Sequence, residues 1–402
     1  MERLLLYVFV IFLFTACDGS SKSDISTILT PVCQYDSLFV VDLDSTSVKK
    51  ELRTSSFCSK VKYIALETNK SSLLGRISQV LSKGDTLFIL DAIVTKQVQV
   101  FLNNGKHIAT LGNRGNGPEE YINPTSIGLD NSNIYIYDVS QKEIIYFDAQ
   151  TLKYKESLKI NPDIVNRYIS IIDDKIYSDA YVRNGISPFL IQMIDAETGR
   201  SEKKWLSTFD YALNYQNSLY FTGDVYFYRV NDGVRYYNMF GDTIMNLTKN
   251  SVHPYCVIKS KDFVKKQELD GLRDSHGSKF NDFYNEIKGI YNIKHYVEWD
   301  NYIMFYLTQS NFILSVLLDK HTRNFIVANQ FYDDLSFKTK DKCIFPIPIL
   351  GDKLGFYAYV HPLEMEYLLK LYNEDCVSEE LKNYIKRKEI KEDSNPILLY
   401  YE

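Results

Sequence analysis

The sequence has few cysteines, and none of them has the spacing of a metal or redox site. Six cysteines occur in 402 residues, and no C-x-x-C motif is present. Zinc ribbons and thioredoxin-like redox chemistry have no support, because both need closely spaced cysteines. Five cysteines remain besides Cys17, so an exported chain with one or two disulfides would keep at least one thiol unpaired. A buried apolar position is the ordinary place for most of them, which are Cys33, Cys58, Cys256, Cys343 and Cys376.

The sequence also lacks a positive charge excess and the common catalytic motifs. Its formal net charge is −5, and its basic residues are scattered rather than clustered. A nucleic-acid-binding surface would need a basic face, so no nucleic-acid partner is predicted. No G-x-S-x-G, Walker A or Rossmann glycine pattern follows a predicted strand, and the run G-N-R-G-N-G lies between strands rather than before a helix. Acyl transfer and nucleotide chemistry have no positive evidence, and no cofactor is predicted.

No apolar run in the N-terminal region is long enough to span a membrane. The longest, Leu4 to Phe14, has 11 residues and follows Arg3, whereas a membrane-spanning helix needs about 20. This pattern is typical of the apolar part of a signal peptide. We therefore expect residues 1–16 to be removed on export.

The end of this run carries a second signal. Phe14-Thr15-Ala16-Cys17 resembles a bacterial lipobox, in which the cysteine becomes the lipidated first residue. The alternative is an ordinary secretory signal with an incidental cysteine. The small polar residues Asp18 to Ser23 suit a tether, so we predict lipidation of Cys17 and a tether and lead-in over residues 17–57. The expected location is the cell envelope, at the outer membrane, with its periplasmic or surface orientation left open.

Aromatic residues are abundant, and the chain is organised around a repeated strand pattern. The 32 tyrosines and 23 phenylalanines favour β-structure, and packing in a β-core explains them better than a sugar-binding surface. In Gln97 to Tyr121, alternating apolar residues lead to Asn104-Gly105, which predicts a hairpin with a type I′ turn. A glycine-rich corner follows.

The same unit of turn, aromatic strand, loop and second strand occurs six times. Its turns begin at Gly84-Asp85, Asn131-Ser132, Asp173-Asp174, Asn231-Asp232, Asp300-Asn301 and Gly351-Asp352. An apolar strand precedes the turn in most copies, so each unit supplies four strands. Repeats of roughly 40–50 residues with four short strands indicate β-propeller blades. We predict an all-β, six-bladed propeller of four-stranded antiparallel blades over residues 58–402. A pair of β-sandwiches is the alternative, but no Pro/Gly/Ser-rich linker divides the chain.

The ends of the chain and two insertions complete the predicted fold. Val61 to Thr68 alternates cleanly and is predicted as the first strand of the folded body, after a polar lead-in, Ile25 to Phe57, that contains strand-like Leu38 to Leu43. Either Val61 to Leu66 or Pro396 to Tyr401 could close the ring. Apolar spacing predicts a helical insertion over about 261–290 and a short charged helix over Ser378 to Lys388.

These motifs together resemble one family. The lipobox, V-K-Y-I-A-L-E-T, F-L-N-N-G-K-H-I-A-T-L-G and G-N-R-G-N-G-P-E-E-Y are similar to those of six-bladed β-propeller lipoproteins of Bacteroides-type bacteria, which are related in shape to NHL-repeat and TolB-like propellers. Phe240 to Ile244 and Asp393 to Leu398 also fit that pattern. The resemblance implies an envelope lipoprotein and leaves its biochemical role open.

Arg114, Glu119 and Glu120 form the sharpest polar cluster in the sequence. They lie on the glycine-rich corner that joins the first blade to the second. An arginine beside two carboxylates could bind a sugar or a peptide end. The structural interpretation, which we favour, is that the glycines and Pro118 shape the corner and the charges hold neighbouring blades together.

The histidines allow a second function. No H-x-x-x-H or H-E-x-x-H spacing occurs, but a propeller can gather metal ligands from separate blades, and His253, His295 and His361 stay open as candidates. No metal site and no catalytic residue is predicted. The leading hypothesis is a non-catalytic binding or scaffolding module. Its partner would be a glycan, a peptide or an envelope protein, bound at the mouth of the propeller's central channel. The alternative is a metal-dependent lyase or hydrolase with its site in the central channel.

Overall fold

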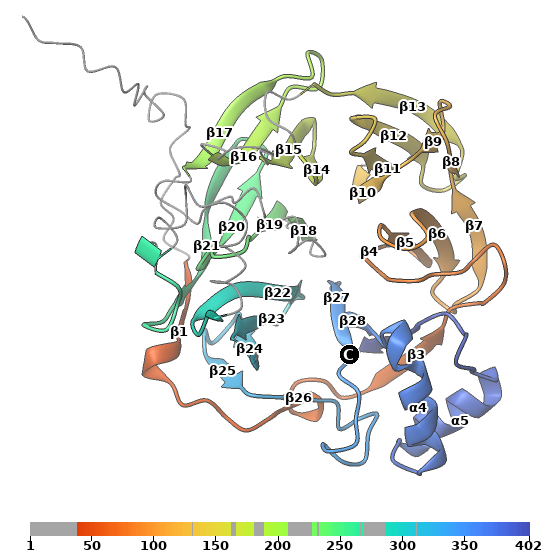
Figure 1. Cartoon of the computed structure of the whole chain (residues 1–402), viewed down its shortest axis with the longest axis vertical. Coiled ribbons are helices and arrows are strands. Elements are labelled where there is room, and N and C mark those ends of the chain that lie inside the picture. The colour runs from red at the N-terminus through yellow and green to blue at the C-terminus, as the bar shows by residue number, and fades with distance from the viewer. Residues whose placement is uncertain are drawn as a thin grey trace, which may run out of the picture.

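The fold is a six-bladed β-propeller, as predicted. The computed structural model describes residues 38–130, 132–161, 166–180, 189–207, 227–230, 233–265, 267–268, 286–310 and 312–402. Six sheets of at least four strands stand around a central axis, and the blades follow one another around the ring (Figure 1). Neighbouring blades pack their apolar faces together, because a single four-stranded sheet cannot bury both of its faces.

Each blade begins with the strand nearest the axis. Blade 1 consists of β4 (Gln79–Lys83), β5 (Thr86–Asp91), β6 (Gln97–Leu102) and β7 (His107–Leu111), and blade 2 of β10 (Pro124–Asp130), β11 (Asn133–Asp138), β12 (Glu143–Asp148) and β13 (Tyr154–Lys159). Blade 3 consists of β14 (Ile169–Ile172), β15 (Lys175–Asp179), β16 (Phe189–Ile194) and β17 (Ser201–Ser207). Blade 4 consists of β18 (Phe227–Val230), β19 (Gly233–Tyr236), β20 (Thr243–Thr248) and β21 (Ser251–Lys259). Blade 5 consists of β22 (Ile290–Glu298), β23 (Tyr302–Gln309), β24 (Phe312–Asp319) and β25 (Phe325–Ala328), and blade 6 of β27 (Ile347–Gly351), β28 (Phe356–Tyr359), β29 (Ile397–Tyr401) and β3 (Val61–Ala65).

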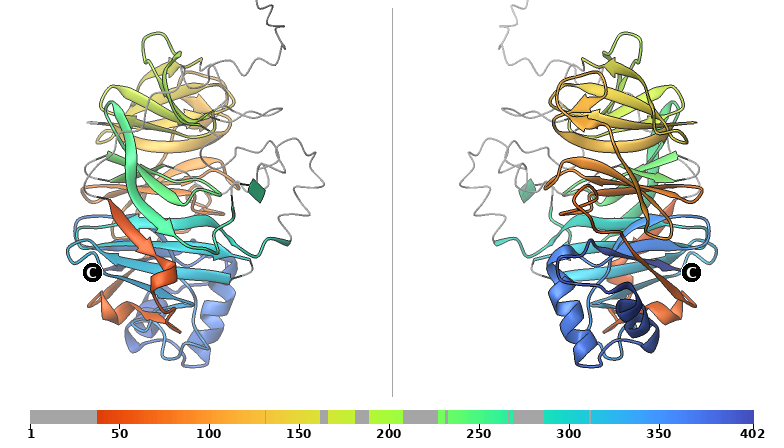
Figure 2. Two further views of the ribbon diagram at one scale, coloured as in Figure 1. Left: turned by 90° about the vertical axis from the view of Figure 1, so that its left-hand side faces the viewer. Right: turned by 90° about the vertical axis from the view of Figure 1, so that its right-hand side faces the viewer.

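Each of the six predicted turns falls in the sequence between the first and second strands of a blade, although Asn131 and the pair Asn231-Asp232 lie outside the described residues. We call the face that carries these turns the turn face, and the opposite face, which carries the connections between second and third strands, the loop face. Seen from the side, the ring places its helices on the loop face and its C-terminus toward the turn face (Figure 2). The inner strands therefore run from the loop face to the turn face, where their C-terminal ends converge.

The hairpin around Asn104-Gly105 is present, but its turn is not type I′. Gly105 has a φ of +89°, whereas Asn104 is not among the residues with positive φ. The amide of Gly105 donates to the carbonyl of Leu102 at 2.9 Å, and the Leu102 amide donates to Lys106 at 2.8 Å. A three-residue loop with glycine in the left-handed position explains this pattern. The type I′ prediction was wrong because the loop contains Asn103 as a third residue.

Both ends of the chain close the ring in blade 6. The C-terminal β29 pairs antiparallel with β28 on one side and with the N-terminal β3 on the other. The two segments predicted as alternative closing strands thus lie side by side. The Ser59 amide donates to the carbonyl of Glu402 at 2.6 Å, which fixes the C-terminus beside the start of β3.

Val61 does not begin the first strand, because the lead-in already contributes two. β1 (Phe39–Asp42) pairs parallel with β21 as a fifth strand of blade 4, and the strand expected within Leu38 to Leu43 is confirmed. After η1 (Leu43–Ser45), β2 (Leu52–Arg53) pairs parallel with β26 (Phe331–Tyr332), and η2 (Thr54–Ser56) leads toward β3. Composition gave no sign of these pairings, because their partners lie more than 200 residues away in the sequence.

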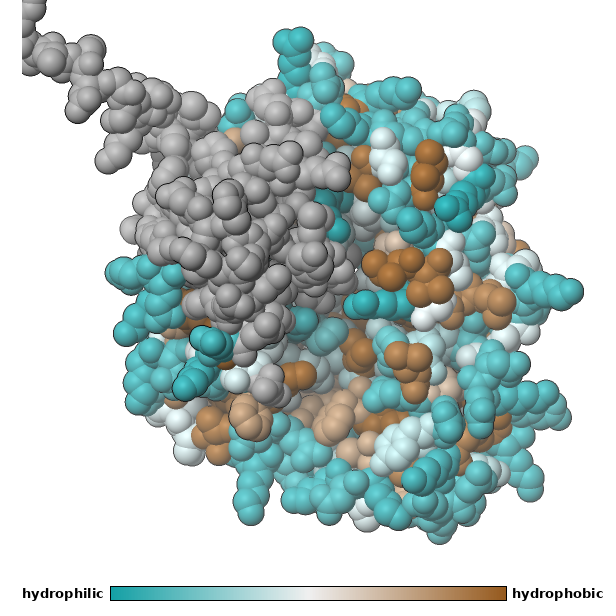
Figure 3. Space-filling model, in the orientation of Figure 1, coloured by the Kyte–Doolittle hydropathy of each residue, from teal (hydrophilic) through white to brown (hydrophobic). Residues whose placement is uncertain are grey.

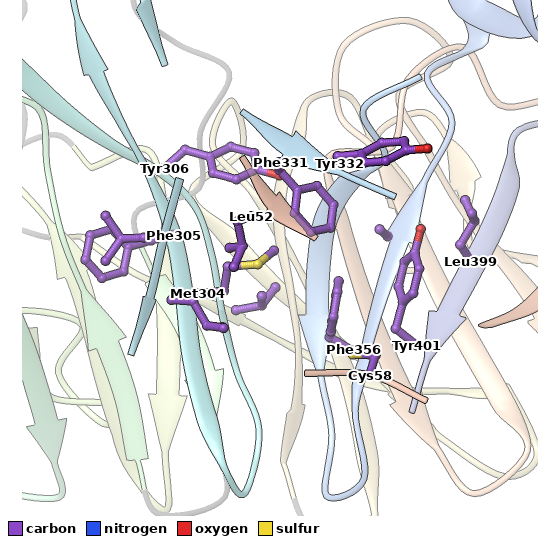
Figure 4. Packing of buried hydrophobic residues seen from close by; sticks show 14 of the residues in the cluster. Leu52, Cys58, Met304, Phe305, Tyr306, Phe331, Tyr332, Phe356, Leu399 and Tyr401 are labelled. Carbon is purple, nitrogen blue, oxygen red and sulfur yellow. The ribbon is translucent and has the colours of Figure 1, made fainter. Parts of the chain in front are cut away.

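The lead-in fills the seam between blades 5 and 6. Leu52 is 2% exposed and belongs to the largest buried cluster of the described residues. In Figure 4, Leu52 lies between the side chains of blade 5 and Phe331, and Cys58 lies beside Phe356. This segment is therefore part of the hydrophobic core and not only a connection to the body.

Two helices lie between the second and third strands of blade 6. α5 (Glu379–Lys388) confirms the helix predicted there, and the Ser378 hydroxyl caps it by accepting from the Leu381 amide. The sequence reading missed η4 (Pro362–Glu364) and α4 (Met365–Asn373), although Met365, Leu368 and Leu371 are buried at helical spacing. The predicted insertion over 261–290 falls mostly outside the described residues. None of the helices in the described part is long and apolar enough to cross a membrane.

Buried aspartates fasten the start of three blades. Asp91, Asp138 and Asp179 each end the second strand of their blade and are at most 5% exposed. Each carboxylate accepts hydrogen bonds from two successive backbone amides just before the inner strand of the same blade. These amides belong to Gly75 and Arg76, to Ile122 and Asn123, and to Arg167 and Tyr168. The repeated aspartate thus has a structural role in blades 1 to 3.

Tyrosine hydroxyls connect neighbouring blades. Tyr135 of blade 2 accepts from the Ile171 amide of blade 3 at 3.1 Å, and Tyr177 of blade 3 donates to the Thr248 carbonyl of blade 4 at 2.8 Å. Gly128 makes room for the first of these, since a Cβ there would meet the Tyr135 hydroxyl at 2.1 Å. The abundance of tyrosine thus reflects packing in the β-core, with a polar atom that links the sheets.

Candidate functional site

The predicted cluster Arg114, Glu119 and Glu120 lies at the outer rim of the ring. The glycine-rich corner forms a small parallel pair, β8 (Asn113–Arg114) with β9 (Glu120–Tyr121), between β7 of blade 1 and β10 of blade 2 (Figure 1). Arg114 and Glu119 are exposed, and Glu120 is half-buried. Within the described part of the chain, Arg114 forms no ion pair with either glutamate.

Glu120 is the member of this cluster with a defined contact. Its Oε2 accepts from the Gly117 amide at 2.7 Å, and a Cβ at Gly115 would meet the same oxygen at 2.1 Å. The side chain of Gln141 in blade 2 donates to the carbonyls of Gly115 and Glu120, both at 3.2 Å. The corner therefore packs around the Glu120 carboxylate and is tied to the second blade.

The inner strands of the ring surround a central channel. A cavity of about 90 Å³ lies between the inner strands of blades 1, 4, 5 and 6. Its lining includes His295, Tyr296 and Arg229 together with apolar residues of β4 and β27. These residues come from strands far apart in the sequence, which only the closed ring brings together.

The channel opens into a larger pocket at the turn face. This pocket, which we call the turn-face pocket, has a volume of about 540 Å³ and is lined by residues of every blade except blade 3. Its lining consists of Leu81, Ser82, Leu129, Arg229, Val230, Tyr255, Glu298, Trp299, Asp300, Lys320, Leu350, Gly351, Asp352 and Lys353. Leu81, Arg229 and Leu350 line both hollows, so the cavity and the pocket adjoin.

A buried carboxylate, Glu298, forms one wall of the turn-face pocket. Glu298 ends the inner strand of blade 5, and its side chain is 5% exposed. Arg235 of blade 4 donates to both of its oxygens, from Nε to Oε2 at 3.0 Å and from Nη2 to Oε1 at 3.2 Å. This bidentate pair is the geometry in which a guanidinium binds a carboxylate most strongly.

Three further donors complete the surroundings of Glu298. The Tyr255 hydroxyl donates to Oε1 at 2.7 Å, the Tyr296 hydroxyl to Oε2 at 2.6 Å, and Lys320 Nζ to Oε1 at 2.9 Å. The Arg235 guanidinium also lies over the Tyr255 ring, 3.7 Å from its centroid. We call Arg235, Tyr255, Tyr296, Glu298 and Lys320 the Glu298 network.

The network keeps Glu298 ionised. Burial acts to raise the pKa of the Glu298 carboxyl, but the charges of Arg235 and Lys320 and the hydrogen bonds from Tyr296 and Tyr255 together lower that pKa below its usual value. Burial raises the pKa of Tyr296 well above its usual value, so its hydroxyl remains a donor. A carboxylate held by five hydrogen bonds serves to position its neighbours and is a poor general base.

Tyr228 connects this wall to the next blades. Its hydroxyl accepts from the Gly351 amide at 2.5 Å and from the Glu298 amide at 3.4 Å. A Cβ at Gly351 would meet the Glu298 carbonyl at 2.0 Å, so glycine allows the inner strands of blades 5 and 6 to approach this closely. The pocket wall is thus built from blades 4, 5 and 6 together.

The three candidate histidines do not converge. His253 lies in β21 of blade 4, where its ring meets the Asn246 amide at 3.1 Å; His295 lines the channel from β22; and His361 precedes η4 on the loop face. Among the residues that the structure describes, no group of three His, Cys, Asp or Glu side chains could hold a metal ion. The pKa of His361 is lowered by partial burial and by nearby Arg76.

The described cysteines are buried and unpaired. Cys58, Cys256, Cys343 and Cys376 are all free thiols. Burial raises the pKa of Cys58 and of Cys256 to about 12 and that of Cys343 to about 11. Because the thiolate is the reactive form, these three side chains behave as small apolar residues, as the sequence reading expected for most of them.

The loop face carries exposed apolar side chains. Ile93 and Val94 of blade 1 are 48% and 62% exposed, and Leu363 of blade 6 is 87% exposed. Figure 3 views this face and shows hydrophobic groups over the adjoining parts of blades 1 and 6. Exposed apolar groups that lie near one another are a candidate contact area for another molecule.

Sequence reasoning missed the turn-face pocket and the Glu298 network. Arg235, Tyr255, Glu298 and Lys320 lie on four different strands or turns over 86 positions, with no common motif. One signal was available in the sequence. The apolar strand Ile290–Glu298 ends in a glutamate, which places a charge at the end of an inner strand. Its partners could not be named before the order of the blades was known.

Comparisons with known proteins agree with this architecture. The solved structure of a Bacteroides fragilis protein named "Putative exported protein" superposes with a TM-score of 0.72 at 17% identity, and the match covers 91% of this chain and 99% of that one. A Bacteroides caccae protein of unknown function and Citrobacter koseri AztD give TM-scores of only 0.28 and 0.35, at 12% and 10% identity, with coverage of 35% and 64% of this chain and 53% and 61% of theirs.

Comparison with curated proteins gives no match. The likeness to the Bacteroides fragilis structure establishes the fold alone, given its low sequence identity. A family model described as "Domain of unknown function (DUF4934)" matches residues 38–402, from the first strand of the lead-in to the last residue of the closing blade. The chain therefore belongs to the DUF4934 family.

Proposed function

We propose that this chain is a lipid-anchored envelope protein whose propeller binds a small ligand at the turn-face pocket without chemically changing it. The observation that carries the proposal is the pocket itself, in which residues of five blades surround about 540 Å³ next to the channel. Ligand sites are commonly concave, of roughly 300–1,000 Å³, and mostly apolar with a few fixed polar groups. Leu81, Leu129, Val230 and Leu350 supply the apolar part, and the Glu298 network supplies the polar part.

A binding role suits the chemistry of the site better than catalysis. The Glu298 carboxylate is occupied by five hydrogen bonds from rigid neighbours, which favours a fixed recognition surface. The ligand or partner would be a glycan fragment, a peptide or a segment of an envelope protein. The exposed apolar residues of the loop face would give such a module a second contact for an envelope partner.

The proposed location rests on the N-terminal sequence. Cys17 would carry the lipid, and residues 18–37 would connect it to β1 at the edge of blade 4. The resemblance to Bacteroides-type propeller lipoproteins of NHL-like or TolB-like shape supports the anchor, and the printed name of the Bacteroides fragilis protein supports export. A Cys17→Ser variant should move from the membrane fraction to the soluble fraction of the envelope, whereas unchanged fractionation would contradict lipid anchoring.

The binding site can be tested by filling the pocket. Ser82→Trp places an indole in the pocket lining, and Ser132→Trp is a matched control, because Ser132 is an exposed residue of a turn on the same face outside the lining. Ligands from envelope extracts should bind the wild type and the Ser132→Trp variant and should not bind the Ser82→Trp variant. Equal binding by all three proteins would contradict the proposed site.

Two further measurements distinguish the alternatives. Ligand binding that survives chelation supports a non-catalytic module, whereas turnover that is lost on chelation would indicate the metal-dependent lyase or hydrolase. An Arg114→Ala variant tests the rim cluster, because the proposal predicts unchanged binding. Lost binding in a stably folded Arg114→Ala protein would move the site to Arg114, Glu119 and Glu120.

A further inference from the structure

We propose that the turn-face pocket recognises a carboxylate on its ligand, and that Lys320 and Arg229 bind this group. This inference rests on the proposed binding function and adds the chemical class of the ligand. Both cations line the pocket, and they come from neighbouring blades, Arg229 from the inner strand of blade 4 and Lys320 from the turn after β24 in blade 5.

Lys320 is held in a fixed position with donor capacity left over. Its Nζ donates to Glu298 Oε1 at 2.9 Å and to the carbonyl of Trp299 at 3.1 Å. An ammonium group has three N–H donors, so these two bonds leave one for a ligand in the pocket. The side chain is 25% exposed, which means that it is largely ordered by its contacts yet reachable from solvent.

Arg229 presents a guanidinium at the junction of channel and pocket. Its Nη1 donates to the Ile171 carbonyl of the neighbouring blade 3 at 2.5 Å, and this contact fixes the side chain. Within the described part of the chain it forms no ion pair with a carboxylate. The Arg229 charge acts to lower the pKa of the Asp130 carboxyl, but partial burial has the larger effect and raises that pKa above its usual value. The remaining guanidinium N–H groups can therefore serve a ligand in the bidentate way that carboxylates favour.

The acidic residues of the pocket do not cancel these two charges. Glu298 is neutralised from behind by Arg235, so the charge of Lys320 is in excess within the network. Asp352 faces its own turn, where Oδ1 accepts from the Leu354 and Gly355 amides and from the Tyr400 hydroxyl. Asp300 is exposed at the edge, as is Lys353. The inner part of the pocket therefore favours a negative group.

The walls indicate an organic carboxylate rather than a bare inorganic ion. Apolar residues from four blades, together with Tyr255 and Trp299, line the pocket with the two cations, and the volume of about 540 Å³ exceeds what a single ion would fill. A carboxylate on a sugar ring and a carboxylate at a peptide end share this chemistry. Both would place an apolar or hydroxylated body against the walls and their charge between Arg229 and Lys320.

The test compares matched charged and neutral probes. Glucuronate with glucose, and N-acetyl-dialanine with its C-terminal amide, are titrated calorimetrically into the full mature chain up to about 10 mM, which covers affinities weaker than millimolar. The expected result is binding of at least one carboxylate probe and at least about 10-fold weaker binding of its neutral counterpart, as for a charge-assisted hydrogen bond. Which of the two acids binds identifies the source of the carboxylate.

Variants locate the carboxylate within the pocket. Lys320→Met and Arg229→Met should each weaken the carboxylate probe about 10-fold or more, and Lys320→Arg should restore most of the loss. Lys106→Met is the control, because it removes the same charge from an exposed turn far from the channel. Chemical unfolding of each variant shows whether it remains folded.

Three outcomes would overturn the inference. They are equal binding of the charged and neutral probes, the same affinity in Lys320→Met, Arg229→Met and Lys106→Met, and no binding of either acid. Failure of the proposed function looks different, since it is the loss of any effect of Ser82→Trp on a ligand from envelope extracts. If the ligand proves to be neutral and Ser82→Trp blocks its binding, the proposed binding function stands and the carboxylate inference is wrong.

Discussion

At the scale of single residues, the turn-face pocket depends on one buried ion pair. Arg235 and Glu298 are 1% and 5% exposed in their side chains, and each would be left as an uncompensated buried charge without the other. Burying an ion pair gains little net stability, but breaking one is costly. The network thus fixes the geometry of Lys320 and of the pocket wall more than it stabilises the fold.

We therefore predict that Arg235→Met lowers the free energy of unfolding by about 3–5 kcal/mol, because Glu298 stays buried with only a lysine and two tyrosines. Urea unfolding at neutral pH measures the loss. Lys249→Met is the control, because the Lys249–Asp174 pair at 3.0 Å is exposed to solvent and should contribute little to stability. Similar small losses in both variants would contradict a structural role for the network.

The raised pKa of Asp179 makes the stability of the fold depend on pH, in the direction opposite to a carboxyl whose pKa is lowered, such as that of Glu298. Burial raises its pKa to about 6 even though its carboxylate accepts two backbone amides, whereas an unfolded aspartate has a pKa of about 3.9. The folded protein thus holds this proton more tightly. Its stabilising contribution is complete below about pH 4 and is lost as the pH rises through about 6.

We predict that the stability of the wild type relative to an Asp179→Asn variant changes with pH. The difference in free energy of unfolding between wild type and variant should fall by about 3 kcal/mol from pH 4 to pH 7, since one pKa unit corresponds to 1.36 kcal/mol. Urea unfolding at four pH values measures it. A difference that rises with pH would mean that the folded-state pKa of Asp179 is lowered instead.

At the scale of elements, the blades use local chemistry that a sequence can reveal. All six turns between first and second strands were predicted from Gly, Asn and Asp pairs, because such turns depend on only a few neighbouring residues. The aspartate after the second strand was visible as well, in T-L-F-I-L-D and N-I-Y-I-Y-D. The structural role of this aspartate could not be predicted, because the backbone amides that it binds are brought to it only by the fold.

The buried aspartate at the end of a second strand should contribute far more to stability than a similar aspartate in an exposed turn. Asp138 accepts from the Ser140 and Gln141 amides at 2.7 and 3.1 Å as well as from two amides before β10. We expect Asp138→Ala to cost roughly 3 kcal/mol, because several buried amides lose their acceptor. Asp148→Ala, which removes contacts to the amides of Gln150 and Thr151 at an exposed turn, should lower the stability much less. Thermal unfolding of the two variants decides between this expectation and an equal effect.

The parts of the site that the sequence could not predict are those that join distant elements. Lys320 and Arg229 approach one pocket only because blades 4 and 5 are neighbours in a closed ring. β1 joins blade 4 through a parallel pairing with a strand more than 200 residues away, and a four-residue apolar segment carries no sign of its partner. The rim cluster, in contrast, was visible in the sequence because its residues lie within seven positions, and the corner that carries them does lie between blades 1 and 2 as predicted.

At the scale of the whole molecule, the lead-in binds blades 4, 5 and 6 together. It pairs with β21, contacts blade 5 through Lys49 and Ala328, and inserts Leu52 between blades 5 and 6. Stability of the ring therefore depends on residues before the first blade. The same three blades build the wall of the turn-face pocket, so the lead-in helps to hold together the blades that form this wall.

We predict that Leu52→Ala lowers the free energy of unfolding by about 2–4 kcal/mol, because it leaves a cavity in a packed seam. Val48→Ala provides the control within the same segment, since Val48 is 45% exposed and should change stability by less than about 0.5 kcal/mol. The measurement is the urea midpoint of the mature chain. Indistinguishable midpoints for the two variants would show that the lead-in is a loose connection.

The closing blade sets the order in which the molecule can be finished. β29 lies between β28 and β3, so a strand that follows all the other blades in the sequence is an interior strand of its sheet. Blades 1 to 5 can form from the residues that precede β29, but β28 and β3 are joined only when Ile397–Tyr401 is in place between them. Without this strand the circle would stay open inside blade 6.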